Sequence, residues 1–313
     1  MPVIKRPRKG SLQFYPRKRA AKFVPSVNWK PIAGEGVLGF IAYKVGMATA
    51  IVKDSTPKTM ASGKQISLPV TILEVPNMKV YSVRFYKDGQ VLKETVVSKD
   101  KELKRILKAP KELPNFDSAI PQAYDDIRII AYSIPSQTHI KKTPDIIELA
   151  VGAKNKLEFV KTIIGKELSL PDLLKSPFVD VRGLTIGKGL QGPVARFGIS
   201  LRQHKSEKGV RRPGSLGPWH PARVTYYTPM AGQLGMFTRV HYNLKVLGTG
   251  KIAEKDINPP SGFRHYGKIH SSYIVVKGSV QGPPKRQILL TTPFRLTRDN
   301  TKLQYELLEL HTF

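Results

Sequence analysis

The side chains that could do chemistry are most concentrated in residues 181–253. This segment holds twelve Lys and Arg residues, many glycines and a single acid, Glu207. Lys and Arg neutralise phosphates, and glycine lets a backbone approach them closely. General acid–base catalysis needs positioned proton-transfer groups, and carboxylates are scarce here. The pattern predicts an anion-binding surface and disfavours a catalytic centre.

Two glycine patterns are similar to nucleotide-binding loops but lack the rest of each motif. Gly34, Gly36 and Gly39 match G-x-G-x-x-G, yet a predicted strand follows them where a dinucleotide fold needs a helix. The run from Gly183 to Gly189 is one residue too short for a Walker A loop, and glycine replaces its magnesium-binding Ser or Thr. We expect the second run to contact nucleic-acid phosphates through its backbone.

Three histidines of the same region, His204, His220 and His241, are candidate metal ligands or nucleic-acid contacts. Their spacings of 16 and 21 residues match no zinc motif, and the chain has no Cys. We therefore predict no metal site and expect these histidines to stack on, or hydrogen-bond to, a base or phosphate.

A Trp-His pair, Trp219 and His220, lies between two prolines in an arginine-rich stretch. A lone Trp is most often a core residue. Two flanking prolines, however, disfavour a buried helix or strand. The alternative that we favour is a rigid, exposed loop whose aromatic tip stacks on bases.

The whole composition agrees with a nucleic-acid partner. The 313 residues include 52 Lys and Arg against 23 Asp and Glu, which gives a formal net charge of +29. Binding to a membrane surface usually needs an amphipathic basic helix or a lipid anchor, and neither is evident. No run of 18 apolar residues predicts a transmembrane helix. The absence of Cys excludes disulfides and thiolate catalysis, and we expect a cytoplasmic protein.

The charge is unevenly distributed along the chain. Residues 94–180 hold 14 basic and 13 acidic side chains, as an ordinary soluble domain does. The first 34 residues hold nine Lys or Arg, no acid and four aromatic residues: Phe14, Tyr15, Phe23 and Trp29. Such a segment cannot bury enough surface to fold alone. A solvating tail is one interpretation, and the aromatics favour an arm that becomes ordered on nucleic acid.

Apolar runs and turn signals predict the elements that must position these residues. Two helices are predicted at 99–108 and 155–164. Strands are predicted at 37–43, 47–53, 66–75, 79–86, 90–97, 126–133, 145–151, 178–186, 272–276, 287–291 and 304–311. A β-barrel whose strands come from both sides of an inserted α/β module explains this order. Residues 187–250 lack clear periodicity, which predicts a long loop or extension.

Several motifs together resemble one known family. The strongest is Leu173 followed by Asp180-x-x-Gly183-x-Thr185-x-Gly187-Lys188-Gly189-x-x-Gly192-x-x-x-Arg196. Others are Gly214-Ser215-Leu216-Gly217-Pro218-Trp219-His220-Pro221-Ala222-Arg223-Val224, Met230-Ala231-Gly232-Gln233-Leu234-Gly235, and Ser11 to Ala20 with Arg17, Lys18 and Arg19. Shorter matches lie at 39–47, 265–267 and 276–278. Over essentially its whole length the chain resembles the universal L-three family of large-subunit ribosomal proteins.

The resemblance implies a fold and a function. Family members have a translation-protein-type β-barrel with an α/β insertion in archaea and eukaryotes, and an arm and a central extension that penetrate ribosomal RNA. It implies a structural protein that binds large-subunit RNA near its 3′ end, supports early assembly and sends the Trp219 tip toward the peptidyl transferase centre. It implies ribosomal RNA and neighbouring large-subunit proteins as partners, within the cytoplasmic large subunit. No enzyme activity, cofactor, membrane partner or homo-oligomer is expected.

Departures from the family pattern point to an archaeal-type member. Some eukaryotic relatives carry a modified histidine where this chain has Glu207, so that modification is not expected here. The chain also ends soon after its last predicted strand, without the longer basic tail of eukaryotic relatives.

The resemblance, taken with the charge pattern, gives a domain division and a set of contacts. We expect an arm at 1–36, a barrel from 37–93 and 178–313, an inserted module at 94–177, and an extension at 187–250. The expected ribosomal RNA contacts are Arg17, Lys18, Arg19, Lys188, Arg196, Arg202, His204, Lys205, Lys208, Arg211, Arg212, Ser215, Trp219, His220, Arg223, Gln233, Arg239 and His241.

Two other classes of protein share some of these features. A DNA-architectural protein fits the composition and would bind duplex DNA as well as structured RNA. An RNA-modifying enzyme is disfavoured because the basic loops lack a cofactor fingerprint and catalytic acids.

Overall fold

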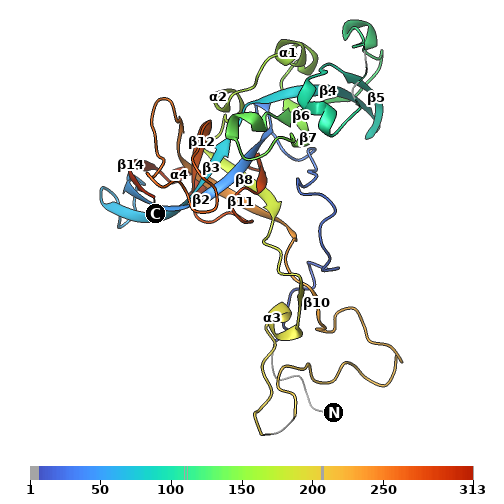
Figure 1. The fold of residues 1–313 in the computed structure, drawn as a ribbon, viewed down its shortest axis with the longest axis vertical. Helices are drawn as coiled ribbons and strands as arrows, with labels where there is room; N and C mark the ends of the chain where they lie inside the picture. Colours follow the sequence, from blue (N-terminus) through green and yellow to red (C-terminus); the bar gives the residue numbers. More distant parts are fainter. Residues whose placement is uncertain (1–6, 109, 111, 206–207, 313) are drawn as a thin grey trace. The chain divides into compact units, whose positions relative to one another are not determined.

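The computed structural model describes residues 7–108, 110, 112–205 and 208–312, so Glu207 lies outside the described residues. The chain divides into two compact units (Figure 1). The smaller unit is formed by Met1–Lys22 and Leu184–Thr238, and the larger unit by Phe23–Gly183 and Arg239–Phe313.

The described part of the chain is mainly β, as predicted. The strands of the larger unit are β1 (Gly36–Val37), β2 (Gly39–Asp54), β3 (Gln65–Val75), β4 (Met78–Lys87), β5 (Gln90–Val96), β6 (Asp126–Ser133), β7 (Ile146–Gly152), β8 (Phe178–Leu184), β11 (Thr238–Lys251), β12 (Ser272–Lys277), β13 (Gln287–Thr291) and β14 (Tyr305–His311). Its helices are short: α1 (Lys156–Ile163), α2 (Leu170–Leu173), α4 (Arg298–Lys302) and the 3₁₀ turns η1 (Lys101–Arg105), η2 (Asp117–Ala119) and η3 (Pro135–Thr138).

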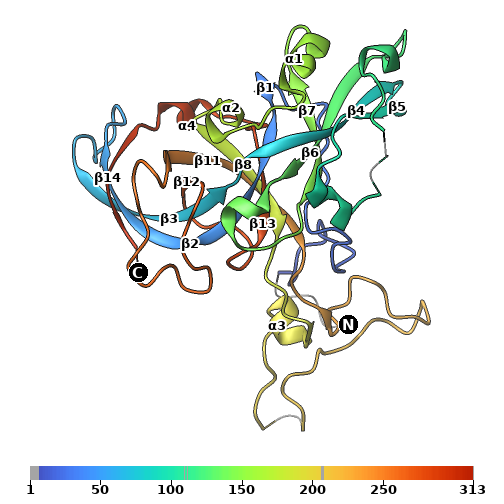
Figure 2. The same ribbon diagram turned by 45° about the horizontal axis from the view of Figure 1, so that its top comes forward.

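One sheet of the larger unit contains a closed ring of strand pairings. Its order is β13-β8-β11-β12-β3-β2-β14, and β13 pairs with β2 as well as with β8. Figure 2 shows the long curved strands β2 and β3 that form one side of it. A ring of paired strands leaves fewer unpaired edges than an open sheet does. The strands come from both sides of residues 94–177 in the sequence, and the translation-protein-type barrel stays a prediction.

Strand β2 differs from the sequence prediction, which divided it into two strands at Gly46. The strand is continuous and pairs with β13, β3 and β14 along its length. The register shifts between Lys44 and Gly46, so an extra residue bends the strand without ending it. A β-bulge can use a glycine in this way, which a propensity-based reading takes for a break.

The second sheet is antiparallel, with the order β1-β7-β6-β4-β5. We expected β4 and β5, which begin within 37–93, to belong to the barrel, but they pair in this sheet beside β6. The chain changes sheet at the Pro76-Asn77 turn, where Val75 ends β3 and Met78 begins β4. A turn signal marks that the chain reverses but does not say which partner the next strand takes. The domain division itself stays a prediction.

The helix predictions had different outcomes. α1 lies within one residue of the predicted 155–164 at each end. The helix predicted at 99–108 is instead the 3₁₀ turn η1. Its Leu103 is fully buried beside Tyr81, Ile130 and Tyr132, so the apolar spacing was correct but the element is shorter.

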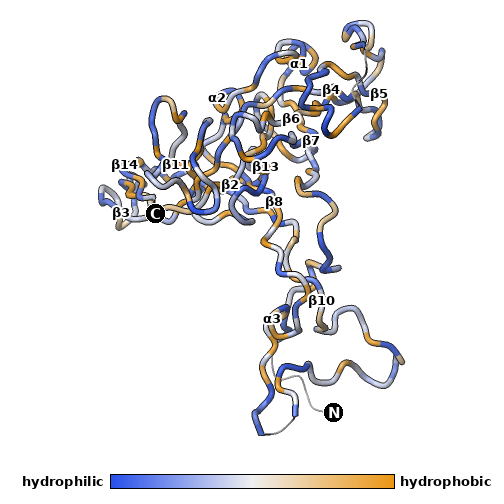
Figure 3. The backbone as a smooth tube through the Cα atoms, in the orientation of Figure 1, coloured by the Kyte–Doolittle hydropathy of each residue, from blue (hydrophilic) through white to orange (hydrophobic). Residues whose placement is uncertain are grey.

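One hydrophobic core joins the two sheets of the larger unit. It includes Ile41 of β2, Val83 of β4 and Leu149 of β7, all fully buried. Figure 3 shows that apolar stretches lie along these strands. Trp29, counted above among the aromatics of an RNA-binding arm, belongs to this core and is 4% exposed. The arm interpretation is therefore wrong at Trp29, because the chain beyond residue 22 packs on the larger unit.

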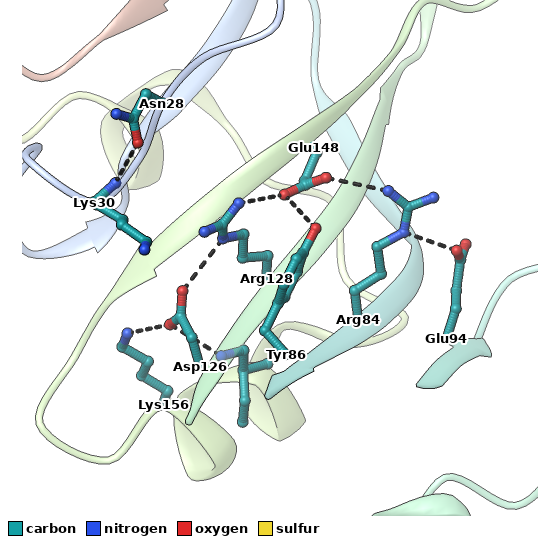
Figure 4. A network of polar contacts seen from close by, with 10 residues as sticks. Asn28, Lys30, Arg84, Tyr86, Glu94, Asp126, Arg128, Glu148 and Lys156 are labelled. Atoms are coloured by element: carbon teal, nitrogen blue, oxygen red, sulfur yellow. Dashed lines mark hydrogen bonds and ion pairs between the residues drawn. The ribbon is translucent and has the colours of Figure 1, made fainter. Parts of the chain in front are cut away.

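The acids of the inserted segment are largely used within its own sheet (Figure 4). Glu148 accepts from Arg84 at 3.1 Å and from Arg128 at 2.8 Å. Arg84 also pairs with Glu94 at 2.7 Å, and Arg128 with Asp126 at 3.2 Å. Partly exposed pairs each contribute little to stability, but together they neutralise this sheet face. Many of the acidic and basic residues of this segment, which are nearly equal in number, thus form ion pairs within the protein.

Asp180, from the strongest family motif, has a structural role in the larger unit. Its carboxylate is fully buried and accepts the backbone N–H of Asn243 at 2.8 Å and of Phe294 at 2.9 Å. A carboxylate satisfies two such donors better than a neutral side chain does. It thereby fixes β11 at Asn243, and the segment after β13 at Phe294, against β8.

We predict that Asp180→Ala lowers the free energy of unfolding by about 2 kcal/mol or more, because two backbone donors lose their acceptor. Thermal unfolding of the purified chain, followed by circular dichroism, measures the change. Asp299→Ala is the control, since Asp299 is 91% exposed and pairs only with Lys302. Equal unfolding midpoints for the two variants would contradict the role given to Asp180.

Candidate nucleic-acid interface

The smaller unit is built from a narrow antiparallel ladder. Strand β9 (Leu190–Gln191) pairs with β10 (Gly232–Gln233), and the short helix α3 (Pro193–Phe197) follows β9. Backbone hydrogen bonds extend the ladder from Lys188 N to Leu234 O and from Thr185 N to Phe237 O, at 2.9 and 3.0 Å. The two ends of the long loop 192–231 are thus held side by side. The remainder of that loop has little regular structure.

Gly235 allows the ladder to close. Its φ is +77°, and a Cβ built there would lie 1.9 Å from the carbonyl oxygen of Ile186. Any side chain would therefore collide with backbone. This accounts physically for a glycine in the motif that ends with Gly235.

Arg196 connects three backbone segments of the smaller unit. Its Nε donates to Gln233 O at 2.9 Å, Nη1 to Met230 O at 3.0 Å and Nη2 to Arg17 O at 3.2 Å. Carbonyl groups that lack a strand partner are satisfied by one planar guanidinium, which presents several donors in a fixed geometry. Burial, and secondly the nearby Arg17, lower the pKa of Arg196 from its ordinary value. We call these contacts the Arg196 clamp.

The N-terminal arm packs on the rest of the smaller unit. Arg17 Nη1 donates back to Arg196 O at 3.2 Å, and its guanidinium lies 4.5 Å from the centre of the Phe197 ring. Ala20 N donates to Met236 O at 2.9 Å. Phe197 is itself buried, so α3 and the arm form a small core. The arm described here is ordered by protein contacts within the smaller unit.

The smaller unit has an extreme charge balance. Its two segments contain eight Lys or Arg each and together a single acid, Glu207. Like charges so concentrated repel one another unless anions lie between them. A polyanion that follows the loop supplies such anions.

Most of the predicted contact residues are exposed. Within the smaller unit this holds for Lys18, Arg19, Lys188, His204, Lys205, Lys208, Arg211, Arg212, Ser215, Trp219, His220 and Arg223. Trp219 is 87% exposed, so the alternative that it is a core residue is excluded. The base of this exposed loop is fixed by Thr228, whose hydroxyl donates to Leu216 O at 3.1 Å.

Other predicted contact residues have partners inside the protein. Arg17 and Arg196 form the clamp, and Arg202 donates to Pro213 O at 2.9 Å. Gln233 donates to Leu234 O at 3.1 Å, and the Ser215 hydroxyl to Gly217 O at 3.2 Å. Their sequence pattern indicated RNA contact, whereas these hydrogen bonds shape the unit. A role for them in RNA binding stays a prediction.

Two of the predicted residues, Arg239 and His241, lie on β11 in the larger unit. His241 is exposed, with Nδ1 3.2 Å from Ser279 O. The sequence predicted no periodic structure through residue 250, but β11 begins at Thr238. A strand signal was present and overlooked, because polar and apolar residues alternate from Arg239 to Val246, although burial along the strand does not alternate.

Sequence reasoning missed a pair of exposed tyrosines, Tyr226 and Tyr227. Their rings contact edge to face, with centroids 5.6 Å apart. Arg8 donates to Tyr227 O at 2.9 Å. The available signal was two adjacent aromatics in a loop with a single acid, Glu207, which is uncommon for a segment that buries little.

The described residues contain no group of three or more His, Asp or Glu that could hold a metal ion. None of the described helices has the length and apolar character to span a membrane.

A mainly β protein with a unit this rich in cations has the features of the class that binds folded nucleic acid. The family model described as Ribosomal protein L3 matches residues 1–111 and 97–310. The large ribosomal subunit protein uL3 of Methanocaldococcus jannaschii is 38% identical over 310 residues, covering 93% of this chain and 92% of the relative. That of Methanococcus vannielii is 40% identical over 311 residues, covering 94% and 93%. The chain belongs to the ribosomal protein L3 family, and these relatives are archaeal.

We predict that Arg196→Gln opens the ladder of the smaller unit, because three backbone carbonyls lose their donor. Amide hydrogen exchange at Leu234, which donates to Gly189 O, should accelerate at least about tenfold, which corresponds to about 1.4 kcal/mol of local stability. Arg223→Gln removes the same charge from an exposed position and should leave this exchange rate unchanged. Equal amide exchange rates at Leu234 in the two variants would contradict the role given to the Arg196 clamp.

Proposed function

We propose that the chain is a structural constituent of the large ribosomal subunit that binds ribosomal RNA, chiefly through the smaller unit. The observation that carries the proposal is sixteen Lys and Arg residues against one acid, Glu207, in the two segments of that unit, in a chain of this family. Phosphate contacts supply affinity, and shape, 2′-hydroxyl and stacking contacts supply specificity.

The finer parts of the proposal follow the family. The chain binds near the 3′ end of large-subunit RNA, supports early assembly and presents the Trp219 tip toward the peptidyl transferase centre. Its partners are ribosomal RNA and neighbouring large-subunit proteins. The exposure of Trp219 and of the cations around it supports this arrangement. The proposed role is to organise folded RNA and includes no chemical step.

Co-sedimentation tests the proposal directly. A tagged chain should migrate with the large subunit on a sucrose gradient. It should remain there after a wash near 0.5–1 M monovalent salt, because an extension that penetrates folded RNA is retained although each neutralised phosphate makes its binding weaker in salt (about 0.7–0.9 logarithmic unit of salt dependence for each). Migration at the top of the gradient, or equal affinity for duplex DNA, would favour a DNA-architectural protein instead.

We predict that exposed loop cations set the salt dependence of RNA binding. Replacement of Lys205, Lys208 and Arg211 by Gln should reduce the slope of log affinity against log salt by about 2–3, because up to three phosphates lose their cation. Filter binding to a large-subunit RNA transcript measures the slope. The control replaces Lys99, Lys101 and Lys104, which are exposed in the larger unit, and should leave the slope unchanged. Equal slopes for the two triple variants would contradict the proposed interface.

We also predict that Trp219→Ala leaves the melting temperature of the isolated chain unchanged, because the side chain is exposed. In assembled subunits, chemical probing should show increased reactivity of the nucleotides that the tip contacts. A melting temperature lower by several degrees would contradict the exposed-tip arrangement.

A further inference from the structure

A cleft of about 710 Å³ lies within the smaller unit, between the N-terminal arm and the end of the long loop. The arm contributes Leu12, Tyr15 and Lys18, and the loop and α3 contribute Tyr226, Met230 and Arg196. Clefts of this size hold small organic groups. The Arg196 clamp positions both walls, because its Nη1 binds Met230 O and its Nη2 binds Arg17 O.

The ring of Tyr226 contacts two other tyrosine rings, and most of its surface is exposed to solvent. It meets the Tyr15 ring edge to face at 74°, with centroids 5.6 Å apart, and meets Tyr227 in the same manner. Edge contacts leave most of the ring face uncovered, and Tyr226 is 74% exposed. Leu12 and Met230, which line the same cleft, are also exposed apolar side chains. An exposed aromatic and apolar cluster in so polar a unit indicates a surface that a partner covers.

The charges around the cleft select the chemistry of that partner. Lys18 is exposed at the wall of the cleft, and the described residues of the unit include no acid. The partner must therefore combine a flat apolar face with negative charge. A nucleotide does so, because its base stacks on an aromatic ring while its phosphate pairs with a cation.

We propose that this cleft binds one unstacked nucleotide of the RNA, with its base on Tyr226 and its phosphate at Lys18. The proposal rests on the proposed RNA-binding function and adds a site for a single base where arm and loop meet. Single-stranded or bulged nucleotides are the elements of RNA whose bases can be taken up in this way. The cleft would thus read the local structure of the RNA, whereas the loop cations contact phosphates of any sequence.

The test compares three substitutions of Tyr226 in the full chain by filter binding to a large-subunit RNA transcript. Tyr226→Ala and Tyr226→Leu should each weaken binding by about five- to a hundredfold, because base stacking is worth about 1–3 kcal/mol. Tyr226→Phe should bind the transcript about as tightly as the unsubstituted chain does, since it keeps the aromatic ring. Leu92→Ala, an exposed apolar residue of the larger unit, should bind as the unsubstituted chain does. Melting temperatures confirm that each variant is folded.

Chemical probing of the same complexes should identify the nucleotide. One base should be protected by the unsubstituted chain and become reactive with Tyr226→Ala. Unchanged affinity and protection in both the Ala and Leu variants would overturn the cleft proposal. So would recovery by Leu, or loss of a protein neighbour from assembled subunits without any change in RNA protection, since either indicates an apolar or peptide partner. Failure of the unsubstituted chain to bind the transcript would instead overturn the proposed function.

Discussion

The organisation of the smaller unit depends on one guanidinium group. Arg196 donates to the carbonyls of Met230 and Gln233 at the end of the long loop and to the carbonyl of Arg17 in the arm, which is distant in sequence. The unit has few buried apolar side chains, so hydrophobic packing alone gives it little stability. A charged donor with three fixed acceptors replaces part of that core. The arrangement of the arm, ladder and long loop, and hence of the Tyr226 cleft, follows from this clamp.

The two units handle charge in opposite ways. In the larger unit, acids such as Glu148 and Asp126 pair with neighbouring arginines (Figure 4). Asp180 accepts hydrogen bonds from backbone N–H groups. In the smaller unit, the described residues offer no acid to the cations. The larger unit therefore neutralises part of its charge internally, whereas the cations of the smaller unit repel one another unless anions lie between them. The sequence shows this division already, because acids are concentrated at 94–180.

Sequence reasoning predicted the element types well and their partners poorly. The strands at 126–133 and 287–291 and the helix α1 were predicted because apolar periodicity is a local property. β4 and β5 were given to the wrong sheet, and β2 was divided at Gly46, because pairing and bulges depend on distant segments. Likewise Trp29 was assigned to the arm, although it packs in the core.

The sequence by itself determined the charge, the mainly β class, the family and an exposed Trp219 tip, since all these follow from residue types and short motifs. Only the tertiary structure decided which motif residues face outward and which hold the chain. Arg196 and Lys188 look equivalent in the sequence, yet the first binds three carbonyls and the second is exposed. The cleft also escaped prediction, because its walls come from residues about 200 positions apart and only folding brings them together.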